Sequence, residues 1–138
     1  MNFYIIDPDV PGFLVEPWKA IKEDPHLSLI HYVFECCPKA DLIQAYPVFL
    51  ASARLAAAFA EAGLSGYYLK KCVGVKGEQF HIASPGCGGL PTYHWLAANG
   101  RAGVDDFTIT NNLKLIVSEN ALNVMQGFNL ERADISPA

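Results

Sequence analysis

The stretch 113-LKLIVSENALNVMQGFNLERADI-135 reads as a strand, a serine, a short amphipathic helix and a second strand. The earlier stretch 46-YPVFLASARLAAAFAEAGLSGYYL-69 has the same order. In both, a serine stands where a helix N-cap is expected, a glycine follows the helix, and a leucine comes twelve residues after the serine. The corresponding residues are Ser52 and Ser118, Gly63 and Gly127, and Leu64 and Leu130. The sequence therefore predicts two similar β-α-β units, each burying one helical face on a sheet.

The rest of the chain contains further strand patterns, separated by turn-forming residues. Strands are expected over 2–6, 27–35, 79–83 and 92–97. In the second of these, Ile30, Tyr32 and Phe34 belong to the more apolar face and are expected in the core. Any helix within 13–26 is limited to about two turns by its prolines, and 36–45 is expected to be a connection with a helical turn around Leu42. We predict one α+β domain over residues 1–138, a mixed, mostly antiparallel sheet with short helices packed on it.

Composition excludes several classes of protein. Of the 138 residues, 51% are hydrophobic and 17% are charged, which excludes a disordered chain. The net charge of −4 argues against nucleic-acid binding, which normally needs a basic patch. No stretch approaches the roughly 20 apolar residues of a membrane span, and the N-terminus lacks the basic start of a signal peptide. A cytoplasmic protein with its four cysteines reduced is expected.

The segment 76–107 is the least regular part of the chain and is rich in glycine and proline. It contains His81, Cys87 and His94, which together suggest a zinc site, but structural zinc usually uses closely spaced pairs of ligands and none is present. Cys87 lacks an evident electropositive neighbour that would make it a nucleophile, and 86-GCGG-89 lacks the lysine of a phosphate loop. We predict no catalytic residue, no metal and no cofactor, and we expect this segment to contribute to recognition.

Two groups of residues are candidates for binding a partner. Four carboxylates could form an acidic surface that attracts a basic protein: Glu35, Asp41, Asp105 and Asp106. Two histidines and two aromatic residues could line a pocket or an interface: His81, Tyr93, His94 and Trp95.

The segments 94-HWLAANGRAGVDDF-107 and 115-LIVSENALNVM-125 carry a resemblance to a known family. They resemble the Imm11-type (DUF1629-like) bacterial proteins, several of which are immunity proteins of toxin systems. The shared pattern is an aromatic-Trp-Leu, a Gly-rich turn, Asp-Asp-Phe and a Val-Ser-Glu-x-Ala-Leu junction. It is matched here by Tyr93, Trp95, Leu96, Gly100, Gly103, Asp105, Asp106, Phe107, Val117, Ser118, Glu119, Ala121 and Leu122. Segments 41–52 and 63–66 match more loosely, and 35-ECCPKA-40 departs from the pattern, which has a Trp and a Gly there.

The resemblance implies a non-enzymatic bacterial immunity protein. Such a protein binds a cognate toxin, for example one delivered by a type VI secretion system, and neutralises it by covering its active or functional surface. Three other interpretations remain open. The first is a small-molecule or peptide-binding module that uses the His81, Tyr93, His94 and Trp95 region. The second is an enzyme that uses Cys87 or a histidine, and the third is an oligomer joined through its sheet edges.

Overall fold

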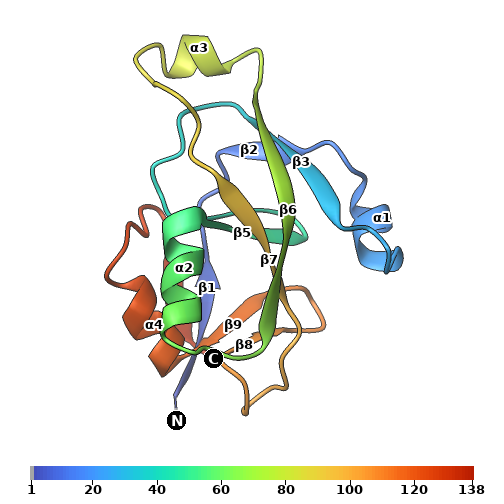
Figure 1. The fold of residues 1–138 in the computed structure, drawn as a ribbon, viewed down its shortest axis with the longest axis vertical. Helices are drawn as coiled ribbons and strands as arrows, with labels where there is room; N and C mark the ends of the chain where they lie inside the picture. Colours follow the sequence, from blue (N-terminus) through green and yellow to red (C-terminus); the bar gives the residue numbers. More distant parts are fainter. Residues whose placement is uncertain (1) are drawn as a thin grey trace.

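The computed structural model describes residues 2–138 as an α+β domain (Figure 1), which confirms the predicted fold class. Its strands are β1 (Phe3–Asp7), β2 (Gly12–Leu14), β3 (Leu29–Phe34), β4 (Leu42–Ala45), β5 (Val48–Ser52), β6 (Tyr67–Lys76), β7 (Tyr93–Ala98), β8 (Phe107–Ile109), β9 (Leu115–Ser118) and β10 (Asp134–Pro137). Its helices are α1 (Trp18–Glu23), α2 (Ala53–Glu61), α3 (Phe80–Ala83) and α4 (Glu119–Met125). Within residues 2–138, no helix combines the length and the apolar character that a membrane span requires.

The strands form two sheets rather than one. The smaller sheet has the order β10-β1-β9-β8 and is antiparallel throughout. The larger sheet has the order β2-β3-β6-β7-β5-β4, and its pairs are antiparallel except for β3 with β6. The prediction of mixed, mostly antiparallel pairing is therefore confirmed.

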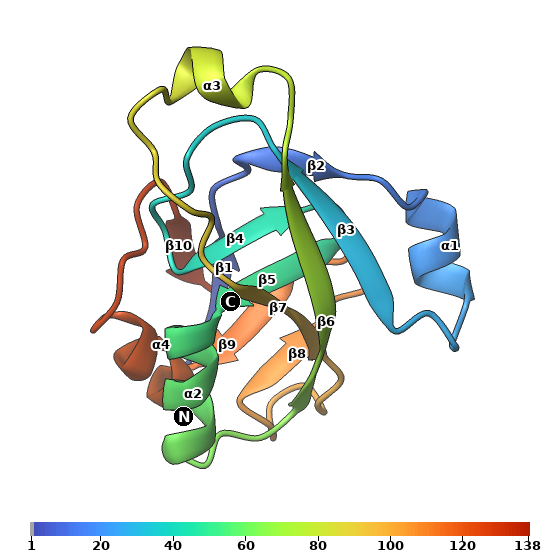
Figure 2. The ribbon, with the colours of Figure 1, turned by 45° about the horizontal axis from the view of Figure 1, so that its top comes forward.

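The larger sheet curls until its two edges approach each other, as Figure 2 shows for β2 and β4. A parallel bridge joins Asp9 to Ile43, and the Tyr32 hydroxyl donates a hydrogen bond across the gap to the Gln44 carbonyl oxygen at 2.9 Å. The concave side encloses a core built from alternate residues of the strands. Its buried members are Ile30, Tyr32, Phe34, Ala40, Ile43, Ala45, Val48, Leu50, Phe80, Tyr93 and Trp95. The prediction that Ile30, Tyr32 and Phe34 face the core is confirmed.

The main core lies on the convex side of the larger sheet. Helices α2 and α4 lie side by side there (Figure 1), and the smaller sheet completes the layer. Its buried members are Ile6, Leu42, Phe49, Ala51, Leu55, Ala56, Phe59, Leu96, Phe107, Leu115, Val117, Ala121, Leu122 and Met125. This core covers β5 and β7, whereas the convex side of β2 and β3 lies beyond it.

Both β-α-β units form as predicted. The Ser52 hydroxyl oxygen accepts a hydrogen bond from the Leu55 N–H at 3.2 Å, and the Ser118 hydroxyl oxygen accepts one from the Ala121 N–H at 3.1 Å. Gly63 ends the first helix with a φ of +68°, a left-handed conformation that suits glycine. Each helix therefore begins at the predicted serine cap.

The two units are joined by an exchange of strands. Strand β7, which leads into the second unit, lies between β5 and β6 of the first unit. Strand β1, from the beginning of the chain, lies between β9 and β10 of the second unit. All four of these pairings are antiparallel, so the two halves repeat one pattern and each completes the sheet of the other.

A carboxylate with several hydrogen-bond partners fastens each exchange, and we call the two arrangements the aspartate latches. Asp41 is buried and Asp106 is partly buried. In the Asp41 latch, the Ser52 hydroxyl donates to Oδ1 at 2.7 Å and the Asn129 N–H donates to Oδ2 at 2.8 Å. The guanidinium group of Arg54 donates to both oxygens, at 2.7 and 2.6 Å. Asp41 thus ties the cap of α2 to the turn that follows α4.

The Asp106 latch is the counterpart in the second unit. The Ser118 hydroxyl donates to Asp106 Oδ1, and the Ser65 N–H donates to Oδ2 at 2.9 Å. Asp106 thus ties the cap of α4 to the turn that follows α2. Each latch joins the helix of its own unit to a backbone N–H of the other unit. Neither unit can therefore make all the hydrogen bonds of its latch without the other.

Two local predictions were wrong. Residues 80–83 form a helix, α3, instead of a strand, because Phe80 alone is buried there and its neighbours are exposed. Residues 42–45 form β4 instead of a helical turn, because pairing with β5 buries Leu42 and Ile43 on opposite sides of the sheet.

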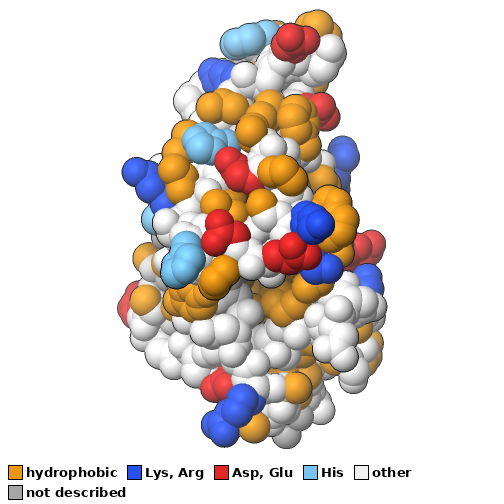
Figure 3. Space-filling view, turned by 90° about the vertical axis from the view of Figure 1, so that its right-hand side faces the viewer, with side chains coloured by type: hydrophobic (Ala, Val, Ile, Leu, Met, Phe, Trp, Pro, Cys, Tyr) orange, Lys and Arg blue, Asp and Glu red, His pale blue; other side chains and the backbone are white. Residues whose placement is uncertain are grey.

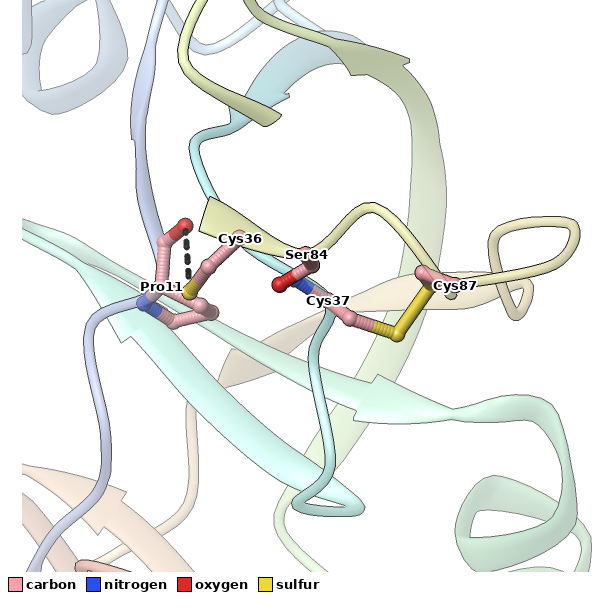
Figure 4. The surroundings of a disulfide bond; sticks show 5 residues. All are labelled: Pro11, Cys36, Cys37, Ser84 and Cys87. Carbon is pink, nitrogen blue, oxygen red and sulfur yellow. Dashed lines mark hydrogen bonds between the residues drawn. A yellow bond between two sulfur atoms is a disulfide. The ribbon is translucent and has the colours of Figure 1, made fainter. Parts of the chain in front are cut away.

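The expectation of four reduced cysteines was also wrong, because Cys37 and Cys87 form a disulfide bond. Figure 4 shows that this bond joins the connection after β3 to the glycine-rich segment after α3. Nearby, the Cys37 N–H donates to the Ser84 hydroxyl oxygen at 2.9 Å. Cys36 and Cys72 remain free thiols. Disulfides are rare in cytosolic proteins, so a count of free thiols in protein taken from cells would test the expected cytoplasmic location.

We expect Asp41→Asn to lower the free energy of unfolding by about 3 kcal/mol at pH 7, because a buried carboxylate loses charge-assisted hydrogen bonds. Burial opposes ionisation of Asp41, but the bonds from Arg54, Ser52 and Asn129 hold its pKa below the ordinary value of 3.8. The stabilisation is complete above pH 3.8 and is lost as pH falls through the lowered pKa of the folded protein. Urea unfolding should therefore show the two proteins converging in acid.

The control for this experiment is Asp134→Asn, at an exposed position of β10. It should change the free energy of unfolding by less than about 0.5 kcal/mol. Equal stability of wild type and Asp41→Asn at pH 7 would contradict the role assigned to the latch.

We expect reduction of the disulfide to destabilise the protein. The cysteines are 50 residues apart in sequence, a loop for which chain-entropy arguments give about 4 kcal/mol. Denaturant midpoints measured with and without reductant should differ, and reduced wild type should match Cys37→Ser. Cys36→Ser keeps the bond and should still respond to reductant. Equal midpoints of the oxidised and reduced wild type would refute the prediction.

Candidate functional site

The four carboxylates that were candidates for an acidic surface do not come together. Asp41, with 4% of its surface exposed, and Asp106 belong to the two latches. Asp105 accepts a hydrogen bond from the Arg101 N–H at 2.6 Å, and this bond is the main reason that its pKa lies below the ordinary value. Only Glu35, just after β3, is exposed. Asp41, Asp105 and Asp106 thus fasten turns, and the four carboxylates do not form the acidic surface expected from the sequence.

The four residues expected to line a pocket are also separated. Tyr93 is buried in the concave core, where its hydroxyl donates to the Ala40 carbonyl oxygen at 2.7 Å and burial raises its pKa. Trp95 lies on the same side of β7, with 7% of its surface exposed. His94 alternates with them and faces the convex side, and His81 is exposed on α3. These four residues do not share one pocket.

The thiols offer no nucleophile of the kind considered from the sequence. Cys87 is bonded to Cys37. Burial raises the pKa of Cys72 to about 11, which keeps this thiol protonated at neutral pH. In the described part of the chain, no group of three or more His, Cys, Asp and Glu side chains is placed to hold a metal ion.

The surface best suited to a partner is the convex side of β2, β3 and the end of β6, which we call the open face. It is defined by Phe13, Val15, Val33, Val73 and Val75. Phe13 pairs with Val33, and Val33 pairs with Val75, so these side chains form one apolar row across three strands. A second row runs from Val15 through His31 to Val73, so its two ends are apolar and its middle position is polar.

The open face is accessible. Phe13, Val15 and Val75 have 49%, 60% and 40% of their surfaces exposed. The solvent side of an antiparallel sheet is usually polar, so an apolar row of three residues with two further valines beside it is unusual there. Contiguous exposed apolar surface of this kind marks interaction sites more often than plain solvent contact.

His31 occupies the middle of the second row and forms a polar pair with Glu16. The Glu16 carboxylate accepts hydrogen bonds from the His31 backbone N–H at 2.6 Å and from its ring at 2.7 Å. Partial burial opposes ionisation of Glu16, but the hydrogen bonds from His31 bring its pKa below the ordinary value. The pair fixes the chain between β2 and α1 against β3, so this part of the open face is held in place.

The side of the molecule shown in Figure 3 carries hydrophobic side chains interspersed with histidines and charges of both signs. This mixture is typical of an interface with an apolar centre and polar surroundings. A standard interface uses about 800 Å² of each partner, which is roughly a tenth of this protein's 7383 Å² surface. A single face of the domain is large enough.

Sequence reasoning missed the open face because it treated 13–26 as a region for a short helix. The signal was present in 13-FLVE-16, where Phe13 and Val15 alternate with Leu14 and Glu16 in the strand period of two. The expected recognition segment, 76–107, contributes none of the five defining residues.

The residues that carry the resemblance to immunity proteins build the scaffold. Trp95 and Phe107 are buried in the two cores, and Ser118 and Asp106 form a latch. Gly100 approaches the Phe107 carbonyl so closely that a Cβ would lie 2.2 Å from its oxygen. These residues are needed for the fold and give no information about a reaction. The sequence matches no protein-family model, and no curated protein is significantly similar to it.

Proposed function

We propose that this protein is a non-enzymatic immunity protein that binds a cognate toxin through the open face. The observation that carries the proposal is the apolar row Phe13–Val33–Val75 on the solvent side of β2, β3 and β6, with Val15 and Val73 on either side of His31 in the next row. The resemblance over residues 94–107 and 115–125 supports the choice of a toxin as the partner. The proposed action is occlusion of the active or functional surface of the toxin.

The structure of the open face suits tight and rapid recognition. Its residues project from paired strands, so little backbone entropy is lost when a partner binds. Phe13 and the valines have few rotamers, which keeps the cost of ordering side chains low. Charges of both signs in the surroundings would fix the orientation of the partner more than they would raise affinity.

The order of the strands explains how the face can stay free for a partner. The main core needs the convex side of β4, β5 and β7, and the concave core needs the opposite side of the sheet. The outer strands β2 and β3 contribute to the concave core and leave their convex side unused. Binding there would not compete with folding.

The test is co-expression with the neighbouring open reading frame, which is expected to encode the toxin. Val15→Lys and Val75→Lys place charges on the open face and should abolish both growth rescue and co-purification, because a buried unpaired charge is costly at an interface. Both positions are exposed, so the variants should keep the melting temperature of wild type within a few degrees.

Val104→Lys is the matched control. Val104 has 57% of its surface exposed and lies in the turn before β8, away from the five defining residues. It should rescue growth as wild type does. The proposal would be contradicted if the product of the neighbouring open reading frame did not inhibit growth. It would also be contradicted if Val15→Lys and Val75→Lys rescued growth fully.

A further inference from the structure

A second surface lies at the end of the curled sheet where β6 begins and β7 ends. It is a groove of about 240 Å³, which we call the lysine groove. The lining residues that matter here are Ile21, Lys22, Tyr68, Lys70, Trp95 and Leu113. Pockets for drug-sized molecules usually start at about 300 Å³, so this groove suits a ligand of the size of one large side chain.

Most of the lining is apolar and aromatic. Trp95 and Tyr68 come from adjacent strands and lie on the concave side of the sheet, at its open end. Ile21 of α1 lines the same groove. A flat apolar group would find extensive contact there.

The charged residues of the groove are all of one sign. Lys22 and Lys70 line it, and its lining includes no Asp or Glu. This is notable in a chain whose net charge is −4. Within residues 2–138, neither lysine takes part in a salt bridge. An anion would therefore be attracted into the groove without competition from a carboxylate of its lining.

Lys70 is held in place for such a role. Its Nζ lies 4.5 Å from the centre of the Trp95 ring and 5.4 Å from that of Tyr68, and it donates to the Leu27 carbonyl oxygen at 3.0 Å. An ammonium group has three N–H donors, and this is its one hydrogen bond within the described chain. The ring contacts fix the lysine, and its remaining donors are free for an incoming oxygen.

The opposite rim shows backbone strain. Leu113 has a φ of +63°, which is unusual for a bulky residue that is not glycine. The turn is fixed by the Leu113 N–H donating to the Thr110 carbonyl oxygen and by the Lys114 N–H donating to the Thr110 hydroxyl, at 2.9 and 3.0 Å. Strained residues of this kind gather at sites that hold ligands, and here the strain belongs to a leucine that lines the groove.

From these features we infer that the lysine groove binds a small carboxylate with an aromatic or branched aliphatic group. The carboxylate contacts Lys70 and Lys22, and the apolar group packs against Trp95 and Leu113. Two sources share this chemistry, a free organic acid and the C-terminal residue of a polypeptide. The groove shares no residue with the five that define the open face, so this inference does not depend on the proposed function.

The chain provides its own reporter for the test. It has two tryptophans, and Trp18→Phe at an exposed position leaves Trp95 as the only one. Titration of this variant with phenylacetate should give a saturable change in fluorescence. Phenylacetamide, which has the same shape and no charge, should bind about tenfold more weakly, because it lacks the charge-assisted hydrogen bond.

Variants of the lysines locate the site. In the Trp18→Phe background, Lys70→Met should weaken phenylacetate binding about tenfold or more, and Lys22→Gln should weaken it less because this side chain is exposed. Lys76→Gln is the matched control, since Lys76 also lies over an aromatic ring, that of Phe80 at 5.1 Å, but does not line the groove. It should leave binding unchanged, and circular dichroism should show that all three variants are folded.

The peptide Gly-Ser-Gly-Phe, with a free or an amidated C-terminus, identifies the source of the carboxylate. Tighter binding than phenylacetate that is lost on amidation assigns the groove to a chain end, and weaker binding assigns it to a free acid. The inference is overturned if neither phenylacetate nor the free peptide binds the folded protein below about 10 mM, or if Lys70→Met binds as well as its parent.

Discussion

The reciprocal aspartate latches are the interaction on which the rest of this structure depends. Asp41 and Asp106 each accept hydrogen bonds from a helix-capping serine of their own unit and from a backbone N–H of the other unit. Asp41 is buried, and a buried carboxylate is costly unless all its bonds are made together, whereas Asp106 is partly buried. The latches therefore link the placement of both helices, and the exchanged strands β1 and β7 can pair only when both units are in place. The two similar β-α-β units thus form one interlocked scaffold and are not independent of each other.

This scaffold leaves two surfaces of different character. The helices and the smaller sheet occupy the convex side of β5 and β7, so the open face of β2, β3 and β6 remains free. The concave core fills the inside of the curled sheet but ends at Trp95, where the lysine groove begins. The open face is broad and is held on paired strands, which suits a protein partner. The lysine groove is small, aromatic and positively charged, which suits a compact anion. Because they share no residue, ligands on both could be bound at once.

The resemblance to immunity proteins has a physical explanation in this fold. Its most specific residues, from Trp95 through the Gly100 turn to Asp106 and Phe107, and on to Ser118, form core contacts, a close backbone approach and a latch. Such residues identify a scaffold and leave its binding surfaces free to differ. The open face takes its side chains from segments outside this pattern. The function proposed here is therefore argued from the exposed rows, with the resemblance as support for the kind of partner.

The sequence by itself determined the features that depend on neighbouring residues. Alternation predicted β3 and its buried face, and the serines and Gly63 predicted where α2 and α4 begin and where α2 ends. Tertiary structure decided what depends on distant partners. Strand β4 exists because β5 pairs with it, Cys37 meets Cys87 across 50 residues, and Asp41 binds the N–H of Asn129, 88 residues away. From the sequence, Asp41 and Asp106 were expected to be surface charges. The residues next to an aspartate in the sequence do not indicate that its hydrogen-bond partners lie in another unit. The open face was hidden for the same reason, since its rows exist only when three strands separated in sequence are set side by side.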